Sequence, residues 1–219
     1  MDLTSIDKVL TTTRSVRKRL NFERRVENDV IKACIEIALQ APTGANGQGW
    51  HFLVVTDAEK KAVIADYYKQ AWADFYGGNN ENSDPSAGQA HNPKSQRAMW
   101  RSAAYLAENF GKVPVMIIAC LEGRFETGSP FAQASMYGSI LPAVWSLMLA
   151  LRSRGLGSAW TTLHIQFERE IGELLGVPAT YTQAALLPVA YFTGDDFKPA
   201  DRLPAEEVTS WNFWGENPK

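Results

Sequence analysis

The chain contains few of the residues from which metal sites and disulfides are built. Its 219 residues include two cysteines and three histidines. Cys34 and Cys120 belong to no paired motif, and His51, His91 and His164 lie far apart without a HxxxH spacing. We therefore expect no metal site, and we expect both cysteines to be buried thiols in a reducing compartment.

Several common catalytic motifs are also absent. No Gly-x-Gly-x-x-Gly follows a strand pattern, and neither a Gly-Lys-Ser/Thr phosphate loop nor a Gly-x-Ser-x-Gly elbow occurs. The acidic residues form no recognisable general acid/base pair along the chain. Because the sequence contains no evident catalytic set of side chains, it favours chemistry carried by a bound cofactor.

Neither a strong net charge nor a long hydrophobic run is present. Lysine and arginine total 22 against 24 aspartates and glutamates, a formal net charge of -2, which disfavours nucleic acid as a partner. The N-terminus lacks an apolar signal region, and no hydrophobic segment approaches the roughly 18 to 20 residues that span a bilayer. We expect a cytoplasmic protein without a membrane partner, in which residues 1–219 form one domain.

What the chain does contain is a mixed succession of helix and strand patterns. Asn28 and Asp57 are candidate helix N-caps, Pro42 stops the first helix, and Gly155 and Gly176 end two later ones. Helices are expected from residue 28 onward and at 57–76, 131–154 and 167–175. Apolar and β-branched runs predict strands at 52–56, 113–120 and 183–192, and residues 157–162 are predicted to form a further short strand and its exit.

Three segments suggest more than a simple core. The helix at 131–154 is apolar on more than one face, which predicts packing against both a sheet and a partner subunit, and Pro142 is expected to kink it. Residues 77–95 have no period and many breakers, so they form either a lid or a disordered loop, and flanking aromatic residues favour the lid. The tail at 195–219 lacks helical periodicity and must wrap over another surface to be ordered.

The most informative stretch is the amide-rich loop at 41–55, which leads into a strand. Asn46 and Gln48 each offer a donor and an acceptor, and the glycines around them let the backbone approach a ligand closely. A helix stop followed by a tight turn would account for the glycines alone. Two amides followed by Trp50 are more than a turn needs, so the loop is interpreted as a docking site for a flat polar ligand.

Basic residues suggest a phosphate near that ligand. Arg14 and Arg17 flank Ser15, and the guanidiniums are able to hold a phosphate bidentately, although clustered arginines are usually a solvated surface patch. Lys198 and Arg202 form a second basic cluster in the tail. The two clusters and the amide-rich loop together predict a nucleotide-like cofactor.

The ordered set of these motifs resembles the FMN-dependent nitroreductase family. The motifs are Arg14-Ser-Val-Arg17, the loop at 41–55, Gly155-Leu-Gly157 and the segment at 198–208. The resemblance covers nearly the whole chain. It implies an α+β fold, an α/β/α sandwich with a central mixed, mainly antiparallel sheet, in an intertwined homodimer with FMN at the interface. A nitroreductase-like FMN-binding domain would then occupy 1–219.

The resemblance also implies roles for particular residues. Contacts to the FMN phosphate, ribityl chain or pyrimidine edge are implied for Arg14, Ser15 and Arg17, with Arg202 and Lys198 completing the anionic site. Flavin contacts are implied for Asn46, with Thr43 nearby, and for the segment Trp160, Thr161 and Thr162. An alternative interpretation of that segment is a strand after a glycine-capped helix, with no ligand contact. Two departures from the family pattern are Thr13 in place of a further arginine and Gly49 in place of proline.

The function implied is a ping-pong oxidoreductase in which NADH or NADPH reduces the flavin at N5 and a small electron-poor acceptor then reoxidises it. Nitroaromatics and quinones are the expected acceptors, and no side chain acts as a nucleophile. The aromatic residues Trp72, Phe75, Tyr76 and Trp100 are candidate substrate walls or ordinary core residues. Alternatives are reductive dehalogenation, flavin fragmentation, a biosynthetic oxidation, or flavin binding and storage without turnover.

Overall fold

The computed structural model describes residues 2–76 and 93–216. At its centre lies a sheet in the order β1-β2-β4-β3, in which each neighbouring pair of strands is antiparallel. An isolated parallel bridge joins Ser15 to Ser158, so the predicted mixed, mainly antiparallel sheet is confirmed. The strands are β1 (Trp50–Val55), β2 (Val115–Glu122), β3 (Leu156–Ser158) and β4 (Tyr181–Tyr191).

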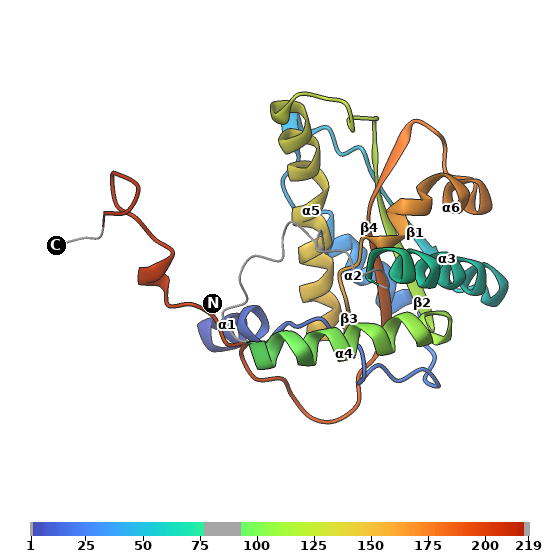
Figure 1. Ribbon diagram of the computed structural model, residues 1–219, viewed down its shortest axis with the longest axis horizontal. Coiled ribbons are helices and arrows are strands. Elements are labelled where there is room, and N and C mark those ends of the chain that lie inside the picture. The colour runs from blue at the N-terminus through green and yellow to red at the C-terminus, as the bar shows by residue number, and fades with distance from the viewer. Residues whose placement is uncertain (1, 77–92, 217–219) are drawn as a thin grey trace.

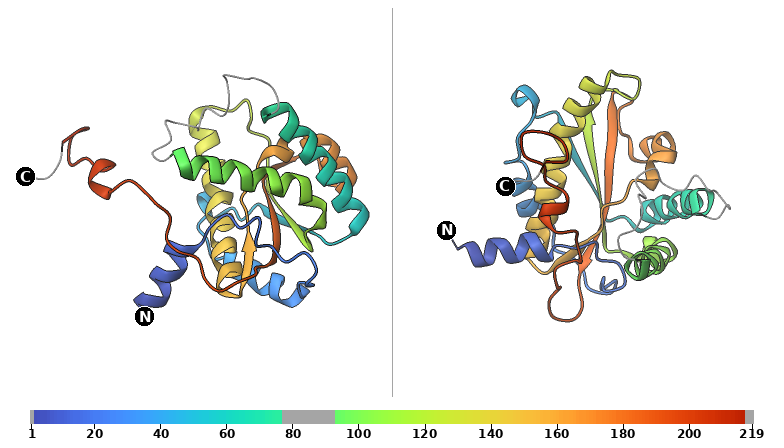
Figure 2. Two further views of the ribbon diagram at one scale, coloured as in Figure 1. Left: turned by 60° about the horizontal axis from the view of Figure 1, so that its bottom comes forward. Right: turned by 60° about the vertical axis from the view of Figure 1, so that its left-hand side comes forward.

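Helices cover both faces of the sheet, as the right-hand view of Figure 2 shows. One face carries α2 (Asn28–Ala38) and α5 (Pro130–Ser153). The opposite face carries α3 (Ala58–Tyr76), α4 (Pro93–Asn109) and α6 (Glu168–Leu175). This layering is the predicted α/β/α sandwich (Figure 1).

The central strands are apolar along their length because both of their faces are covered. Ile117 belongs to the core cluster beneath α2 and α5, whereas Met116 and Ile118 belong to the cluster beneath α3 and α4. Successive side chains of a strand point to opposite faces, so a strand between two helix layers has no polar side. Cys34 and Cys120 are buried free thiols, as expected.

The start of α2 differs from the prediction. Asn28 is the first helical residue, and the N-cap is Glu27, which makes no side-chain cap hydrogen bond. The Glu27 carboxylate instead accepts a hydrogen bond from the Tyr191 hydroxyl at 2.6 Å, so a tertiary contact sets this boundary. The other predicted cap is confirmed, because Asp57 Oδ1 accepts from the amide of Lys60 at 2.9 Å.

The structure confirms a short strand and its exit at 157–162. Only Leu156–Ser158 pairs with β4, and the chain then leaves that edge of the sheet. Thr161 returns to β4 at an isolated bridge, where its amide and hydroxyl both donate to the carbonyl of Leu186. Between the two pairing points Ala159 is buried in the core, whereas Trp160 lines a cleft.

Helix α5 begins at a Ser129 cap, continues through Pro142 without a break and is followed by Gly155, which has φ of 76° as its predicted capping role requires. By length and composition α5 is apolar enough to cross a membrane, which corrects the expectation that no hydrophobic segment approaches that length. Its buried residues pack against the sheet, and this central position accounts for its apolar sequence.

Two helices were not predicted. Asp2 caps α1 (Leu3–Thr12), accepting from the amide of Thr4 at 3.1 Å. Helix α4 starts at Pro93, a residue suited to the first turn of a helix, so residues 93–95 do not belong to a loop as predicted. The remainder of the predicted lid, 77–92, lies outside the described residues.

The tail crosses back below α5 after β4 and then runs away from the body of the chain (Figures 1 and 2). Residues 201–216 are all exposed, and Trp214 is 92% exposed. The expectation that this tail wraps over another surface stays a prediction.

Candidate functional site

A cleft of about 520 Å³ opens where the segment after α1 meets α4, α5 and the tail. We call it the anion cleft. It brings together Arg14, Ser15, Arg17, Trp160 and Arg202, which the sequence analysis had drawn from three separate motifs. Its remaining walls are Thr13, Ser95, Ala98, Met99, Ser102, Trp145 and Met148.

Backbone pairing with β3 places the first motif in the cleft. The amide of Val16 donates to the carbonyl of Ser158 at 2.8 Å, beside the parallel bridge between Ser15 and Ser158. In this extended segment Val16 is buried, while Ser15 and Arg17 line the cleft. The alternation within Arg-Ser-Val-Arg therefore separates a core residue from its ligand-facing neighbours.

The cations of the cleft have no carboxylate partners within the described part of the chain. Arg14 Nη1 donates to the backbone carbonyl of Lys198 at 3.0 Å, and Arg17 Nη1 donates to Ser102 Oγ at 3.3 Å. Arg202 Nη1 bonds a backbone carbonyl at 2.9 Å. Burial lowers the pKa of Arg17 from its ordinary value. Uncompensated guanidiniums facing one cleft favour an anionic ligand.

A second cavity of about 280 Å³ adjoins the anion cleft and shares Arg17, Met99 and Trp160 with it. We call it the aromatic compartment. All four candidate substrate walls line it, together with Thr161 and Thr162. Their rings pack on one another, with centroid separations of 4.4 Å for Trp72 and Tyr76, 4.5 Å for Tyr76 and Trp100, and 4.6 Å for Phe75 and Tyr76.

Tyr68 also lines the aromatic compartment. Its ring stacks on Phe110 with centroids 4.1 Å apart, and burial raises the pKa of its hydroxyl to about 12. The hydroxyl therefore stays protonated at neutral pH. Of the three residues in the Trp160 segment, Thr161 is buried with its amide and hydroxyl bonded to β4, whereas Thr162 is exposed.

The docking loop does not reach the cleft of its own chain. Thr43 and Asn46 line neither cavity, and Lys198 contributes its carbonyl rather than its ammonium. The loop is anchored where the Gly44 amide donates to Ser139 Oγ of α5 at 2.9 Å. Trp145, which lines the anion cleft, lies six residues further along that helix. The anchor of the loop is therefore roughly 9 Å from that wall along the helix axis, at 1.5 Å per residue.

The loop holds an unusual backbone conformation. Ala45, Asn46 and Gln48 have positive φ of 51°, 56° and 51°, a region that non-glycine residues seldom adopt. Gln48 Nε2 donates to Asn46 Oδ1 at 3.2 Å, and the Gln48 amide donates to Thr43 Oγ1 at 3.3 Å. Strain of this kind persists where surrounding contacts impose it and is common at ligand sites.

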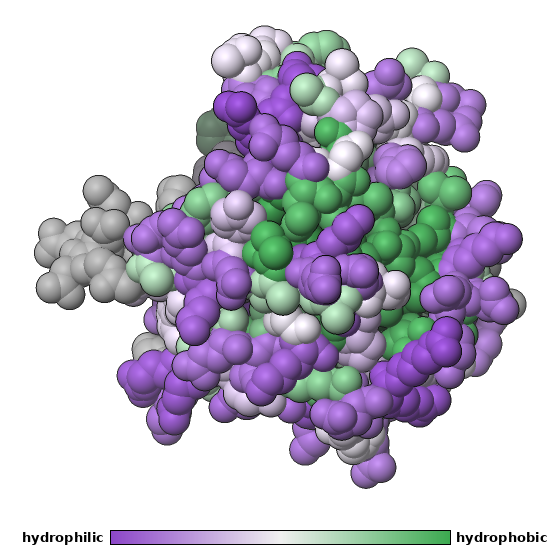
Figure 3. Space-filling model, turned by 90° about the vertical axis from the view of Figure 1, so that its right-hand side faces the viewer, coloured by the Kyte–Doolittle hydropathy of each residue, from purple (hydrophilic) through white to green (hydrophobic). Residues whose placement is uncertain are grey.

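Two further cavities lie beside α6 and differ from the anion cleft in charge. A cleft of about 490 Å³ beside α6 contains Arg124, but Glu168 binds that guanidinium through two hydrogen bonds at 2.9 and 2.8 Å. A smaller pocket of about 190 Å³ next to it is lined mainly by apolar residues, including Leu53 and Val177. Figure 3 shows apolar surface surrounded by polar side chains on the side that carries α3 and α6. Among the described residues, the arginines of these two cavities are paired with carboxylates, unlike those of the anion cleft.

Other titratable groups give no sign of a second chemical centre. Within 2–76 and 93–216 no three His, Cys, Asp or Glu side chains gather as a metal site. His164 is fully buried and neither ring nitrogen has a hydrogen-bond partner in the described structure; burial lowers its pKa to about 3. Burial also raises the pKa of the Cys120 thiol to about 12. His91 lies outside the described residues.

The sequence alone did not reveal the walls that α4 and α5 contribute to the anion cleft. Met99 and Ser102 come from α4, and Trp145 and Met148 come from α5. The apolar spacing of Met99, Leu106 and Phe110 was a usable signal for α4. No local signal pointed to these particular faces as ligand-facing.

Comparisons with known proteins identify the family and the fold of this chain. Residues 10–191 match the Nitroreductase family. Iodotyrosine deiodinase from Thermotoga neapolitana is 30% identical over 199 residues, covering 91% of this chain and 93% of that protein. The structure of the FMN and NADPH-dependent nitroreductase NfnB from Sphigopyxis sp. strain HMH has a TM-score of 0.67 at 21% identity, covering 95% and 99% of the two chains.

A structure of oxidized iodotyrosine deiodinase bound to FMN and 3-iodo-L-tyrosine has a TM-score of 0.66 at 21% identity, covering 95% of this chain and 98% of that one. At this identity the structural likenesses establish the fold, and the match over residues 10–191 establishes the family. The cleft therefore lies in a chain that belongs to the nitroreductase family.

Proposed function

We propose that this chain binds FMN and acts as an NAD(P)H-dependent oxidoreductase that reduces nitroaromatics, quinones or related electron-poor small molecules by a ping-pong mechanism. The observation that carries the proposal is the continuity of the two cavities. Arg14 and Arg202, which have no carboxylate partner in the described part of the chain, line the anion cleft, and Arg17 and Trp160 line both cavities. This order of charge and aromatic surface matches a molecule with a phosphate at one end and a flat ring system at the other.

The residues present fit FMN. Arg14, Ser15 and Arg202 supply guanidinium and hydroxyl donors for a phosphate, and Trp160 supplies an aromatic face. Arg17 is partly buried without a carboxylate partner in the described part of the chain, which suits a site where negative charge accumulates. When bound, FMN supplies two-electron transfer between a nicotinamide and an acceptor.

The protein's own contribution is positioning and electrostatics. Arg17 places fixed positive charge next to the compartment, which favours the more electron-rich form of a ring bound there. The aromatic walls enclose about 280 Å³ in this chain, at the end of the cleft proposed for the flavin ring. Nicotinamide and acceptor would occupy the same place beside that ring in turn, which is a ping-pong arrangement.

We propose a homodimer because Thr43 and Asn46, for which flavin contacts are expected, do not line the cleft of their own chain. We assign the missing Thr43 and Asn46 contacts to a second subunit, since the docking loop lies apart from its own cleft. Phe131 of α5 is 83% exposed, and residues 201–216 of the tail are exposed throughout. Sedimentation should therefore give twice the mass of one chain, and ending the chain after Arg202 should shift it toward monomer. A full-length monomer that binds FMN tightly would contradict this assignment.

The visible spectrum of the purified protein is the first test of the function. We expect a yellow protein that releases FMN, is bleached anaerobically by NADH or NADPH and turns over with a nitroaromatic or quinone. Failure to bind FMN after reconstitution would reject the cofactor assignment. FMN binding without bleaching by either nicotinamide would reject NAD(P)H dependence, and absence of steady-state turnover would favour flavin storage.

Reductive dehalogenation is a second candidate, favoured by the 30% identity to a protein named iodotyrosine deiodinase. In that reaction two electrons and one proton replace the halogen, which leaves as halide. Incubating reduced protein with 3-iodo-L-tyrosine tests it directly. Stoichiometric iodide release faster than nitroaromatic reduction would make dehalogenation the main activity, whereas no iodide would remove it. Product analysis of the flavin itself would reveal fragmentation.

A further inference from the structure

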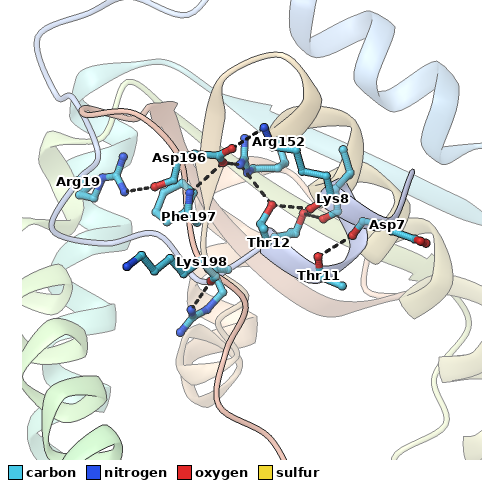
Figure 4. Close-up of polar contacts among 12 residues, drawn as sticks. Asp7, Lys8, Thr11, Thr12, Arg19, Arg152, Asp196, Phe197 and Lys198 are labelled. Carbon is cyan, nitrogen blue, oxygen red and sulfur yellow. Dashed lines mark hydrogen bonds and ion pairs between the residues drawn. The ribbon is translucent and has the colours of Figure 1, made fainter. Parts of the chain in front are cut away.

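A cluster of charged and aromatic residues ties the first turn of the tail to the body of the protein beside the anion cleft (Figure 4). We call it the Asp196 cluster; it consists of Lys8, Arg19, Arg152, Phe192, Asp196 and Phe197. Asp196 Oδ2 lies 2.7 Å from Lys8 Nζ of α1, and Asp196 Oδ1 pairs with Arg152 Nη2 at the end of α5. The same Oδ1 accepts from the amide of Phe197 at 2.8 Å.

Arg19 and Arg152 also contact the first turn of the tail through their guanidinium groups. Arg19 Nε donates to the carbonyl of Thr193 at 2.5 Å, and Arg19 Nη1 donates to the carbonyl of Asp196 at 3.1 Å. The Arg19 guanidinium lies 4.1 Å from the Phe197 ring centroid, and that of Arg152 lies 5.2 Å from it. No other carboxylate in the described ranges contacts Lys8, Arg19 or Arg152. Asp196 is therefore the counter-charge for a locally cationic cluster.

This turn connects directly to the phosphate end of the cleft. Lys198, two residues after Asp196, presents the carbonyl that accepts from Arg14 Nη1 at 3.0 Å. Arg202 follows four residues later and lines the same cleft. A guanidinium has five donors in one plane, so fixing one of them on a backbone carbonyl sets the direction of the others. The position of the tail turn therefore controls where Arg14 and Arg202 aim.

We infer that Asp196 is a positioning residue for phosphate recognition. Its carboxylate neutralises Lys8 and Arg152, anchors residues 193–198 and so directs Arg14 and Arg202 at the phosphate, without itself touching the ligand. The inference rests on the proposed function, since it assigns the phosphate of FMN to this end of the cleft. It predicts that loss of the Asp196 charge weakens the binding of FMN but not that of riboflavin, because riboflavin shares the ring and ribityl chain but lacks the phosphate.

The test compares FMN with riboflavin in the same variant. Asp196→Asn keeps the size of the side chain but removes its charge, and we expect the dissociation constant of FMN to rise by about tenfold, the effect of losing one well-placed charged hydrogen bond. That of riboflavin should change by less than about twofold. Both are measured by flavin fluorescence quenching. The control is Glu173→Gln, which removes an exposed ion pair with Arg169 outside the anion cleft and should change neither constant.

The route through Arg14 is tested by a double-mutant cycle. Adding Asp196→Asn to Arg14→Gln should cost markedly less FMN affinity than Asp196→Asn costs alone, because the two changes disable one contact. Lys8→Met is a milder variant at an exposed lysine, with an expected two- to threefold loss of FMN affinity, about that of a weak surface ion pair, and it serves if Asp196→Asn unfolds the protein.

The outcomes separate the two proposals. If wild-type protein binds neither flavin, the proposed function fails and the inference fails with it. If wild-type protein binds FMN but the variants weaken FMN and riboflavin equally, Asp196 has a merely structural role and the inference alone is overturned. Unchanged FMN affinity in every variant would overturn it as well.

Discussion

Val16 packs against the face of Gly157 in the space that a side chain there would occupy. A β-carbon on Gly157 would lie 2.8 Å from the Val16 side chain, closer than two carbons pack. The contact lets the Arg14 to Arg17 segment lie directly on β3, so the anion cleft depends on the absence of a side chain at position 157. Gly157 thus allows Val16 to pack closely against the backbone of β3, whereas Gly155 ends α5.

Gly157→Ala should consequently weaken both stability and cofactor binding. Forcing a methyl group into this contact costs about 1–3 kcal/mol of the free energy of unfolding. FMN affinity should fall in parallel as Arg14 and Ser15 shift. Gly138→Ala is the matched control, since its β-carbon would meet nothing within 4 Å in this chain. Urea unfolding and FMN titration check both; equal stability of the two variants would refute the packing argument.

His164 should make the protein sensitive to acid. Its pKa is lowered to about 3 in the folded state by burial, against about 6.5 unfolded, so below pH 6.5 the unfolded state binds more protons than the folded state. Folding stability therefore falls as the pH drops from 6.5 toward 3, by up to about 2 kcal/mol at pH 5. His164→Leu should flatten this dependence in urea unfolding series, whereas exposed His51→Gln should retain it. Identical slopes in all three proteins would contradict the prediction.

Replacing Arg17 should weaken FMN binding without destabilising the apoprotein. Its guanidinium is partly buried without a carboxylate partner in the described structure, so Arg17→Met should leave the apoprotein equally stable or more stable, by up to about 1 kcal/mol. FMN affinity should fall at least about tenfold, since a charged donor is lost. Thermal melts of apoprotein and FMN titrations measure the two effects. Arg101→Met, at an exposed position of α4, should alter neither.

Trp72 should affect the acceptor more than the cofactor. Removing its ring with Trp72→Ala should raise the KM of an aromatic acceptor by about three- to tenfold, the value of one aromatic contact. The rate of anaerobic flavin bleaching by NADH should stay within about twofold if the ring contacts only the acceptor. Trp72→Phe, which keeps an aromatic wall, should behave nearly as wild type. Stopped-flow and steady-state assays distinguish these cases, and an equal loss in both half-reactions would place Trp72 outside the acceptor subsite.

Much of the fold was predictable because its signals are local. The β2 run from Val115 to Leu121 is apolar at every position, which a strand between two helix layers requires, and Gly155 and Gly176 take the left-handed conformations that end helices. Boundaries set by distant contacts were mispredicted. Glu27 replaces Asn28 as the cap of α2, in a position where its carboxylate bonds Tyr191, 164 residues away.

The chain sequence by itself determined which residues are chemically capable of holding a phosphate and a flat ring, since guanidiniums, amides and indoles carry that chemistry wherever they lie. Only the tertiary structure decided which of them meet. Arg14 donates to the carbonyl of Lys198, 184 residues away in the chain. The loop that carries Asn46 is instead anchored on α5 through Gly44, away from the anion cleft. Such contacts are set by the packing of whole layers, and the few residues around each position carry no record of them.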